Sequence, residues 1–186
     1  MLRGRGRAEP APAEGPDLGP GHTPVVRVSG KGSGKVSVAG LACYKPGAQP
    51  ACSTRARTHY GRKGESRSMS EADYASLVTA AHNQLHAPVI LIWDNLNTHV
   101  SAAMRAFIAA HPDWLTEARL PTYALDLNAV EGAWANMKNG LGNLAARDVD
   151  QLTAIIKNRL KSIQYQPGLI DAFLAQTGLI LEPEPP

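Results

Sequence analysis

The sequence predicts an α/β protein in which helices flank a mixed sheet. Three observations support this class. Three short strand patterns fall within residues 24–60, a continuous apolar run occupies residues 89–93, and apolar residues recur at helical spacing between and after these segments. A chain of 186 residues with 44% hydrophobic residues can bury one substantial core. The expected order is three strands, a helix, a strand, a helix, a strand and two helices.

Residues 1–23 lie outside the predicted core. They contain four Pro, five Gly and three Arg, with few large aliphatic side chains. Such a segment buries too little apolar surface to offset the conformational entropy lost on ordering. We therefore expect a disordered segment at 1–23, a folded domain at 24–166 and a C-terminal tail at 167–186.

The first three strands are expected to form an antiparallel meander. Their candidates are residues 24–28, 36–44 and 51–60, and a Lys-Pro-Gly turn at 45–47 separates the last two.

A helix is expected to begin after Ser70. Ser70 is a good N-cap, and Asp73 at the third helical position completes a variant of the capping box. Pro88 should stop this helix. Its apolar face would consist of Tyr74, Leu77, Val78, Ala81 and Leu85.

The apolar run at 89–93 predicts a strand covered on both faces. A helix capped by Thr98 or Ser101 should follow, and then a short strand at 116–120.

The two last helices are expected at residues 128–144 and from Asp148 onward. Asn128 is the candidate N-cap of the first, which would place Glu131 at its third position.

Two carboxylates are the main candidates for chemistry. Asp94 directly follows the 89–93 strand, where side chains emerge at the carboxyl edge of a sheet, and Glu131 lies in the first turn of a helix. Hard oxygen ligands from different elements suit Mg²⁺, and two such ions can drive a displacement at phosphorus. Asn95 and Asn97 can order the loop after Asp94, and His99, five residues beyond Asp94, is a further supporting candidate. The alternatives are a turn or cap role for Asp94 and a plain capping-box role for Glu131.

Glu131, Trp134 and Lys138 share one face of the predicted helix. Trp134 is either a core residue or a platform for base stacking. Lys138 either meets a phosphate or is simply exposed.

Charge is uneven along the chain. Residues 1–70 carry twelve Lys/Arg and four Asp/Glu, whereas residues 71–186 carry seven and twelve. A basic region beside an acidic one suits a protein that grips a phosphate backbone and holds metal ions, although basic loops can also be merely solvated. Arg62 and Lys63, in the polar connection after the third strand, are candidate DNA contacts.

Other classes of protein are disfavoured. No apolar stretch reaches about 18 residues, so we expect no membrane span. Cys43 and Cys52 lack matching His spacing for zinc and are expected to be free thiols in a reducing cytosol. The Gly-rich run at 30–35 lacks the spacing and the Ser or Thr of a phosphate-binding loop.

Two motifs resemble those of the DDE transposases, and most closely those of the mariner-related bacterial insertion-sequence branch. Residues 91–99 (LIWDNLNTH) resemble the motif of the second Asp, and residues 120–134 (LPTYALDLNAVEGAW) resemble the motif of the final carboxylate. The likeness covers roughly residues 22–166.

This resemblance implies a ribonuclease H-like fold of the retroviral-integrase superfamily. It implies DNA cleavage and strand transfer at insertion-sequence ends, dependent on two Mg²⁺ or Mn²⁺ ions. Asp94 and Glu131 would be the second and third catalytic and metal-binding carboxylates, with Lys138 near the DNA. Implied partners are transposon ends, target DNA and a second copy in a homodimer. The implied location is the bacterial cytoplasm, at the nucleoid.

The chain departs from the family pattern at its start. The strand with the family's first Asp would precede residue 24, where the Pro/Gly/Arg-rich segment stands, and Asp17 lacks a strand context. The family motif also has Pro where Leu125 and Ala129 stand. We therefore expect a truncated reading frame, with residues 1–21 read from a shifted frame, that lacks the first strand and is inactive. The alternatives are a non-catalytic nucleic-acid-binding module and another Mg²⁺-dependent nuclease of this fold.

Overall fold

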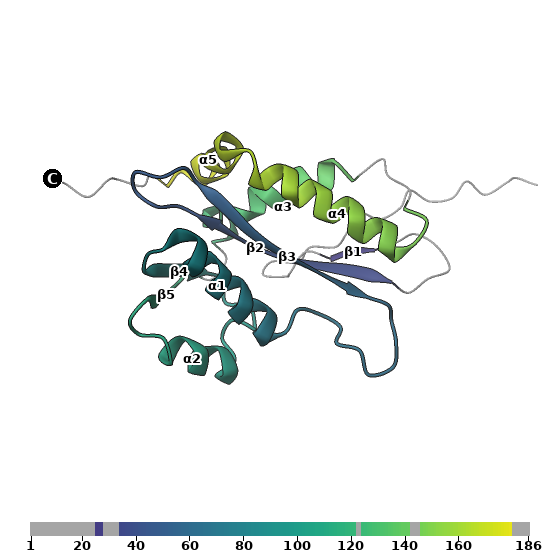
Figure 1. Ribbon diagram of the computed structural model, residues 1–186, viewed down its shortest axis with the longest axis horizontal. Coiled ribbons are helices and arrows are strands. Elements are labelled where there is room, and N and C mark those ends of the chain that lie inside the picture. The colour runs from purple at the N-terminus through teal and green to yellow at the C-terminus, as the bar shows by residue number, and fades with distance from the viewer. Residues whose placement is uncertain (1–24, 28–33, 122–123, 142–145, 180–186) are drawn as a thin grey trace, which may run out of the picture.

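The computed structural model describes residues 25–27, 34–121, 124–141 and 146–179. Asp17, the whole of 1–23 and the Gly-rich residues 30–33 lie outside these ranges. The elements follow the predicted order, with a 3₁₀ turn and a final helix in addition (Figure 1). They are β1 (Val25–Arg27), β2 (Lys35–Cys43), β3 (Ala51–His59), α1 (Glu71–Leu85), β4 (Val89–Trp93), α2 (Ala102–Ala109), β5 (Leu115–Arg119), η1 (Leu125–Leu127), α3 (Val130–Asn139), α4 (Val149–Gln164) and α5 (Pro167–Gln176). The α/β class is confirmed.

The described strands form two sheets where we expected one mixed sheet. β1, β2 and β3 form an antiparallel sheet in that order, as the meander predicted, and β4 and β5 form a parallel pair. β3 pairs with β2 along the whole length of β2. β1 pairs only with the first three residues of β2.

Helices cover both faces of the three-stranded sheet. Figure 1 shows α3, α4 and α5 on one side and α1 on the other, with β4 and β5 beside α1 and with α2 below them in this view. Side chains alternate along β2: Val36 and Val38 pack with α3 and α4, whereas Ala39 joins the cluster built on α1. This alternation follows from the period of two in a strand.

α1 begins as the sequence predicts. The Ser70 side chain accepts a hydrogen bond from the Asp73 backbone N–H, and the Asp73 carboxylate accepts one from the Ser70 N–H. The helix ends before Pro88, because His86 adopts a left-handed conformation with φ of 48°. The chain thus turns out of the helix two residues ahead of the proline.

β4 is buried on only one face, so the prediction of a doubly covered strand is wrong. Leu91 and Trp93 are buried with α1 and α2, but Ile90 and Ile92 are 70% and 59% exposed. In the described part of the chain, no helix packs over this second face.

α3 begins one residue later than expected. Its N-cap is Ala129, so Glu131 occupies the second helical position and not the third. Asn128 still contributes, because its side-chain oxygen accepts a hydrogen bond from the Val130 N–H at 3.2 Å. The helix ends at Asn139, short of the predicted residue 144.

α5 falls within residues 167–186, which we assigned to a C-terminal tail. Pro167 stands at the start of this helix, where its missing N–H costs nothing. Ile170 and Phe173 are buried, and the helix contacts α3 and α4. The other domain boundaries remain predictions.

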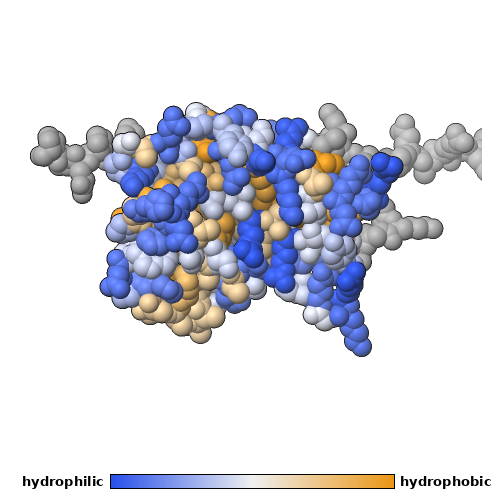
Figure 2. Space-filling model, in the orientation of Figure 1, coloured by the Kyte–Doolittle hydropathy of each residue, from blue (hydrophilic) through white to orange (hydrophobic). Residues whose placement is uncertain are grey.

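The surface is largely polar. Figure 2 shows hydrophilic residues over most of one face and a pale orange patch at the lower left, over the alanine-rich α2. Over the described parts of the chain, no helix has both the length and the apolar composition needed to cross a membrane.

Candidate active site

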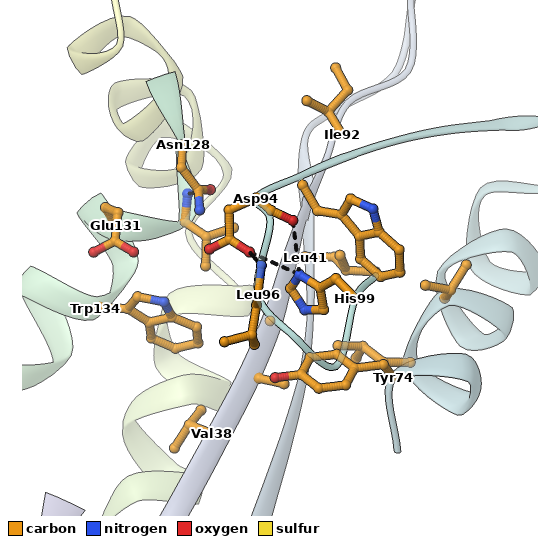
Figure 3. A pocket seen from close by; sticks show the side chains of 16 residues that line it. Val38, Leu41, Tyr74, Ile92, Asp94, Leu96, His99, Asn128, Glu131 and Trp134 are labelled. Atoms are coloured by element: carbon orange, nitrogen blue, oxygen red, sulfur yellow. Dashed lines mark hydrogen bonds and ion pairs between the residues drawn. The ribbon is translucent and has the colours of Figure 1, made fainter. Parts of the chain in front are cut away.

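A pocket lies where β2, α1, β4 and the start of α3 meet (Figure 3). It brings together five of the nine site residues that the sequence predicted: Asp94, His99, Asn128, Glu131 and Trp134. The rest of its lining comes from residues 38–41 of β2, from residues within 74–78 of α1 and 92–96, and from Val130 of α3.

Asp94 follows β4 directly and is held by its own loop. One carboxylate oxygen, Oδ1, accepts hydrogen bonds from the Leu96 N–H at 3.1 Å and from His99 Nδ1 at 2.9 Å. The first bond is the local turn that Asp side chains favour. The side chain is 22% exposed, so the carboxylate is fixed in orientation and still reaches the pocket.

His99 is positioned by aromatic packing. Its ring stacks on Trp93 with centroids 4.3 Å apart and 6° between the planes, and Tyr74 meets it edge-on at 4.7 Å. Its Nε2 is buried and has no hydrogen-bond partner within the described structure. These contacts leave Nδ1 as the group that orients Asp94.

Glu131 approaches the pocket from the first turn of α3, opposite Asp94 (Figure 3). It is half-buried, and this burial raises the pKa of Glu131 above its ordinary value. The positive charge of Lys138 opposes the rise in pKa, and the negative charge of Asp94 adds to it. The two carboxylates are thus close enough to repel each other, which is the electrostatic condition that a bound cation relieves.

Trp134 is a core residue that also lines the pocket. It is 5% exposed, and its ring packs so closely on β2 that a Cβ at Gly40 would lie 3.0 Å from the Trp134 Cη2 atom. Asn95 is exposed, and its side chain donates a hydrogen bond to the Leu120 carbonyl at 3.2 Å, which ties the ends of β4 and β5 together.

The predicted DNA contacts do not line the pocket. Arg62 and Lys63 are exposed in the connection after β3, with the Arg62 guanidinium 5.0 Å from the centre of the Tyr60 ring. Lys138 is partly buried and acts on Glu131 through its charge.

The pocket walls formed by β2 and α1 could not be recognised from the sequence. Val38, Leu41 and Leu77 look like ordinary core residues in their own elements. Only the folding of β2 beside β4 brings them to the carboxylates.

The pocket contains oxygen donors of the type that a hard cation binds, but only a few of them are found among the described residues. Asp94 and Glu131 supply carboxylate oxygens, which Mg²⁺ and Mn²⁺ prefer. Among the described residues, no group of three or more His, Cys, Asp or Glu is arranged to hold a metal ion. Within the described residues, the carboxylates that line the pocket are those of Asp94 and Glu131.

Comparison with known proteins supports one family. The family model described as DDE superfamily endonuclease matches residues 19–153. A comparison with curated proteins found no match.

Similar solved structures include the catalytic domain of the Mos1 mariner transposase. That crystal structure has 14% sequence identity and a TM-score of 0.45, with 87% of this chain and 82% of that chain covered. The Mos1 catalytic domain with raltegravir and Mg has 13% identity and a TM-score of 0.44, with 79% and 85% covered. The Mos1 strand transfer complex has 15% identity and a TM-score of 0.43, with 76% and 47% covered.

The family model spans most of the chain and includes both Asp94 and Glu131, the carboxylates that the fold brings to one pocket. The chain therefore belongs to the DDE superfamily endonuclease family.

Proposed function

We propose that this chain is a catalytic-domain polypeptide of a DDE transposase that binds DNA and holds a divalent cation weakly on Asp94 and Glu131. The observation that carries the proposal is the convergence of these two carboxylates, from β4 and α3, on one pocket. When bound, Mg²⁺ or Mn²⁺ would activate the attacking oxygen and stabilise the leaving oxygen of a phosphodiester.

The residues of the chain have distinct tasks in this proposal. His99 holds the Asp94 carboxylate in one orientation through Nδ1, and the helix start supports the charge of Glu131. Lys138 partly balances Glu131 when no metal is bound. Arg62 and Lys63 are exposed and lie in the part of the sequence that is rich in Lys and Arg, and in this proposal they contact the DNA backbone.

Cleavage by this chain alone is not expected. In the described residues two carboxylates face the pocket, and a pair of ions needs more oxygen donors than two side chains supply. The proposed activity of the isolated chain is therefore binding. The finer expectations, which are the bacterial insertion-sequence branch and the homodimer, belong to this proposal.

Calorimetric titration with Mn²⁺ tests the proposed cation site on Asp94 and Glu131. Wild type should bind weakly, and Asp94→Asn and Glu131→Gln should each abolish the binding, because each removes a charged ligand of similar shape. Asp113→Asn, at an exposed turn residue, is the matched control and should bind as wild type does. Binding that survives both site substitutions would contradict the proposal.

A second candidate, a non-catalytic nucleic-acid-binding module, is favoured by the excess of eight positive charges in residues 1–70. Fluorescence anisotropy with a labelled DNA duplex separates the two. DNA binding that weakens with salt, and that neither Mn²⁺ nor Asp94→Asn changes, supports the non-catalytic module. Binding that Mn²⁺ strengthens, and that Asp94→Asn returns to the metal-free level, supports the metal site.

A further inference from the structure

The segment after β3 is built as a compact turn. Glu65 Oε2 accepts hydrogen bonds from the Tyr60 N–H at 2.9 Å and from the Arg62 N–H at 3.0 Å, and the Glu65 N–H donates to the Arg62 carbonyl at 3.1 Å. Gly61 and Gly64 have φ of 73° and 83°, a conformation that glycine adopts without strain. One carboxylate and two glycines thus fix the shape of a turn whose residues are mostly exposed.

This turn is fastened to the folded core. The buried His59 ring donates a hydrogen bond from Nδ1 to the Ser66 carbonyl at 2.7 Å, and its Nε2 lies 3.0 Å from the Ser37 hydroxyl oxygen. The Tyr60 hydroxyl donates to Asp150 Oδ1 at 2.7 Å, at the start of α4. The exposed side chains of the turn therefore project from a backbone that is held against β2, β3 and α4.

The basic turn, which we define as residues 60–67, presents three cations to solvent. Arg62, Lys63 and Arg67 are exposed, and within the described residues none of them forms an ion pair with Asp or Glu. Hydrogen bonds from the Tyr60 and Arg62 N–H groups lower the pKa of Glu65, so this carboxylate is ionised at neutral pH. Three cations and one carboxylate leave a net charge of +2. Figure 1 shows this segment beyond the end of β3 at the lower right, and Figure 2 shows hydrophilic side chains projecting at that corner.

A row of arginines along β3 connects the pocket with the basic turn. Ala39, which lines the pocket, pairs with Arg55 of β3. Arg55 and Arg57 share one face of the strand and remain partly exposed although both form ion pairs. His59, where the turn begins, stands four residues beyond Arg55 (59 − 55), which is about 13 Å at about 3.3 Å per residue. About four base pairs of duplex DNA cover this distance.

We propose that the basic turn is a preformed contact for the phosphate backbone of duplex DNA, in which Arg62, Lys63 and Arg67 bind phosphates and Glu65 is a positioning residue. The inference rests on the DNA binding of the proposed function and specifies a surface for it. Phosphate contacts carry no sequence information, but they fix where a duplex lies on a protein. The turn holds the duplex about four base pairs from the pocket.

The salt dependence of DNA binding tests the cations. The probe is a fluorescein-labelled duplex of about 20 base pairs, and its anisotropy is followed in KCl with EDTA, so that no divalent metal takes part. Arg62→Ala and Lys63→Ala should each weaken binding at least about threefold at about 0.1 M KCl and reduce the slope of log K against log salt by about 0.9, because each removes one phosphate contact. Lys157→Ala, at an exposed position on α4, is the matched control and should leave both quantities unchanged.

Two substitutions of Glu65 separate the shape of the turn from its net charge. Glu65→Gln removes a negative charge but keeps an acceptor oxygen for the Tyr60 and Arg62 N–H groups, so it should bind DNA at least as tightly as wild type. Glu65→Ala removes the same charge together with the acceptor. Because the turn then loses its fixed shape, binding should weaken at least about threefold relative to wild type. A surface that acts through net charge alone predicts instead that Glu65→Ala matches Glu65→Gln, and unfolding in urea checks that both variants are folded.

Three results would overturn the inference. They are equal DNA binding by the two Glu65 variants, salt slopes of Arg62→Ala and Lys63→Ala equal to that of wild type, and equal losses of binding for Lys63→Ala and Lys157→Ala. In each case wild type still binds the duplex, so the DNA binding of the proposed function stands. A wild type that binds no duplex would overturn both. The Mn²⁺ titration is independent of these measurements, because none of the substituted residues lines the pocket.

Discussion

At the residue scale, Asp73 both caps α1 and connects this helix to β3. Its carboxylate accepts hydrogen bonds from the Ser70 N–H at 2.9 Å and the Ser70 hydroxyl at 2.8 Å. It also pairs with Arg55 and Arg57 of β3. One side chain thus starts α1 and fastens it to the three-stranded sheet.

Asp73→Ala should lower the free energy of unfolding by about 2–4 kcal/mol, because it removes a cap and leaves two arginines without their partner. The side chains of Arg55 and Arg57 are 46% and 38% exposed, so solvent screens their ion pairs with Asp73. We therefore expect the total loss of stability at the low end of that range. Urea denaturation measures the change. Glu71→Ala, in the same helical turn, is the control and should stay within about 0.5 kcal/mol.

Stability should also fall in acid through Asp73. Burial alone would raise its pKa, but hydrogen bonds from Ser70 and Arg57 outweigh that effect and lower the pKa of Asp73 to about 2. Because this is below the ordinary value of 3.8, the stabilisation is complete above pH 3.8 and is lost as the pH falls through 2. Between pH 5 and pH 2.5, wild type should lose about 1–2 kcal/mol more than Asp73→Asn. Equal losses, measured by urea denaturation at both pH values, would refute this assignment.

At the element scale, α5 is an integral layer of the domain. Phe173 is 4% exposed and packs with Ala133 and Ile163. A Cβ at Gly132 would lie 2.7 Å from the Phe173 ring, so the absence of a side chain there lets α5 approach the start of α3. That start carries Glu131.

Phe173→Ala should destabilise the protein by about 3 kcal/mol, since it leaves a cavity between α5, α3 and α4. Thermal or urea denaturation measures the loss. Leu179→Ala is the control, because Leu179 is 44% exposed just beyond the helix and should change stability by less than about 0.5 kcal/mol. If the two variants behave alike, α5 does not contribute to the core.

Helix starts divide into those that the sequence predicts and those that it does not. Ser70, Ser101 and Asp148 each cap a helix through a side-chain oxygen. Ser70 is the cap that the sequence predicts and Ser101 is one of two candidates with Thr98, whereas Asp148 was expected to begin the helix that it caps. These caps are local, because donor and acceptor lie three residues apart. The start of α3 differs, because its N-cap is Ala129, which has no side-chain oxygen. The Val130 N–H instead donates a hydrogen bond to the side chain of Asn128, the residue before the cap.

At the scale of the whole molecule, the two thiols report on the integrity of the three-stranded sheet. Cys43 and Cys52 are 8% and 5% exposed and unpaired, on adjacent strands β2 and β3. Burial raises the pKa of both thiols, and that of Cys52 reaches about 12. The reactive thiolate form is therefore scarce in the folded protein.

Ellman's reagent at pH 8 should modify the native protein roughly a hundredfold more slowly than the urea-unfolded chain, because access requires opening of the sheet. Absorbance of the released thiolate follows both rates. Unfolded protein should release two equivalents quickly, which serves as the internal control. Rapid modification of folded protein would show that β2 and β3 separate easily.

Sequence analysis alone predicted the kinds of element, most of their order, the Ser70 cap, and Asp94 and Glu131 as candidate site residues. These features depend on interactions within a few residues, such as the pairing of Ser70 with Asp73 or the apolar spacing along α1. Asp94 and Glu131 could be chosen because each stands at a position that is special within its own element.

How these parts meet depends on packing between distant segments of the chain. The exposed face of β4, the docking of α5 through Phe173, and the pocket between β2 and β4 all involve residues far apart in the chain. No local pattern encodes such contacts, because each side chain packs according to what the rest of the fold places beside it. The raised pKa of Glu131 has the same origin, since burial, Lys138 and Asp94 act on it together only after folding.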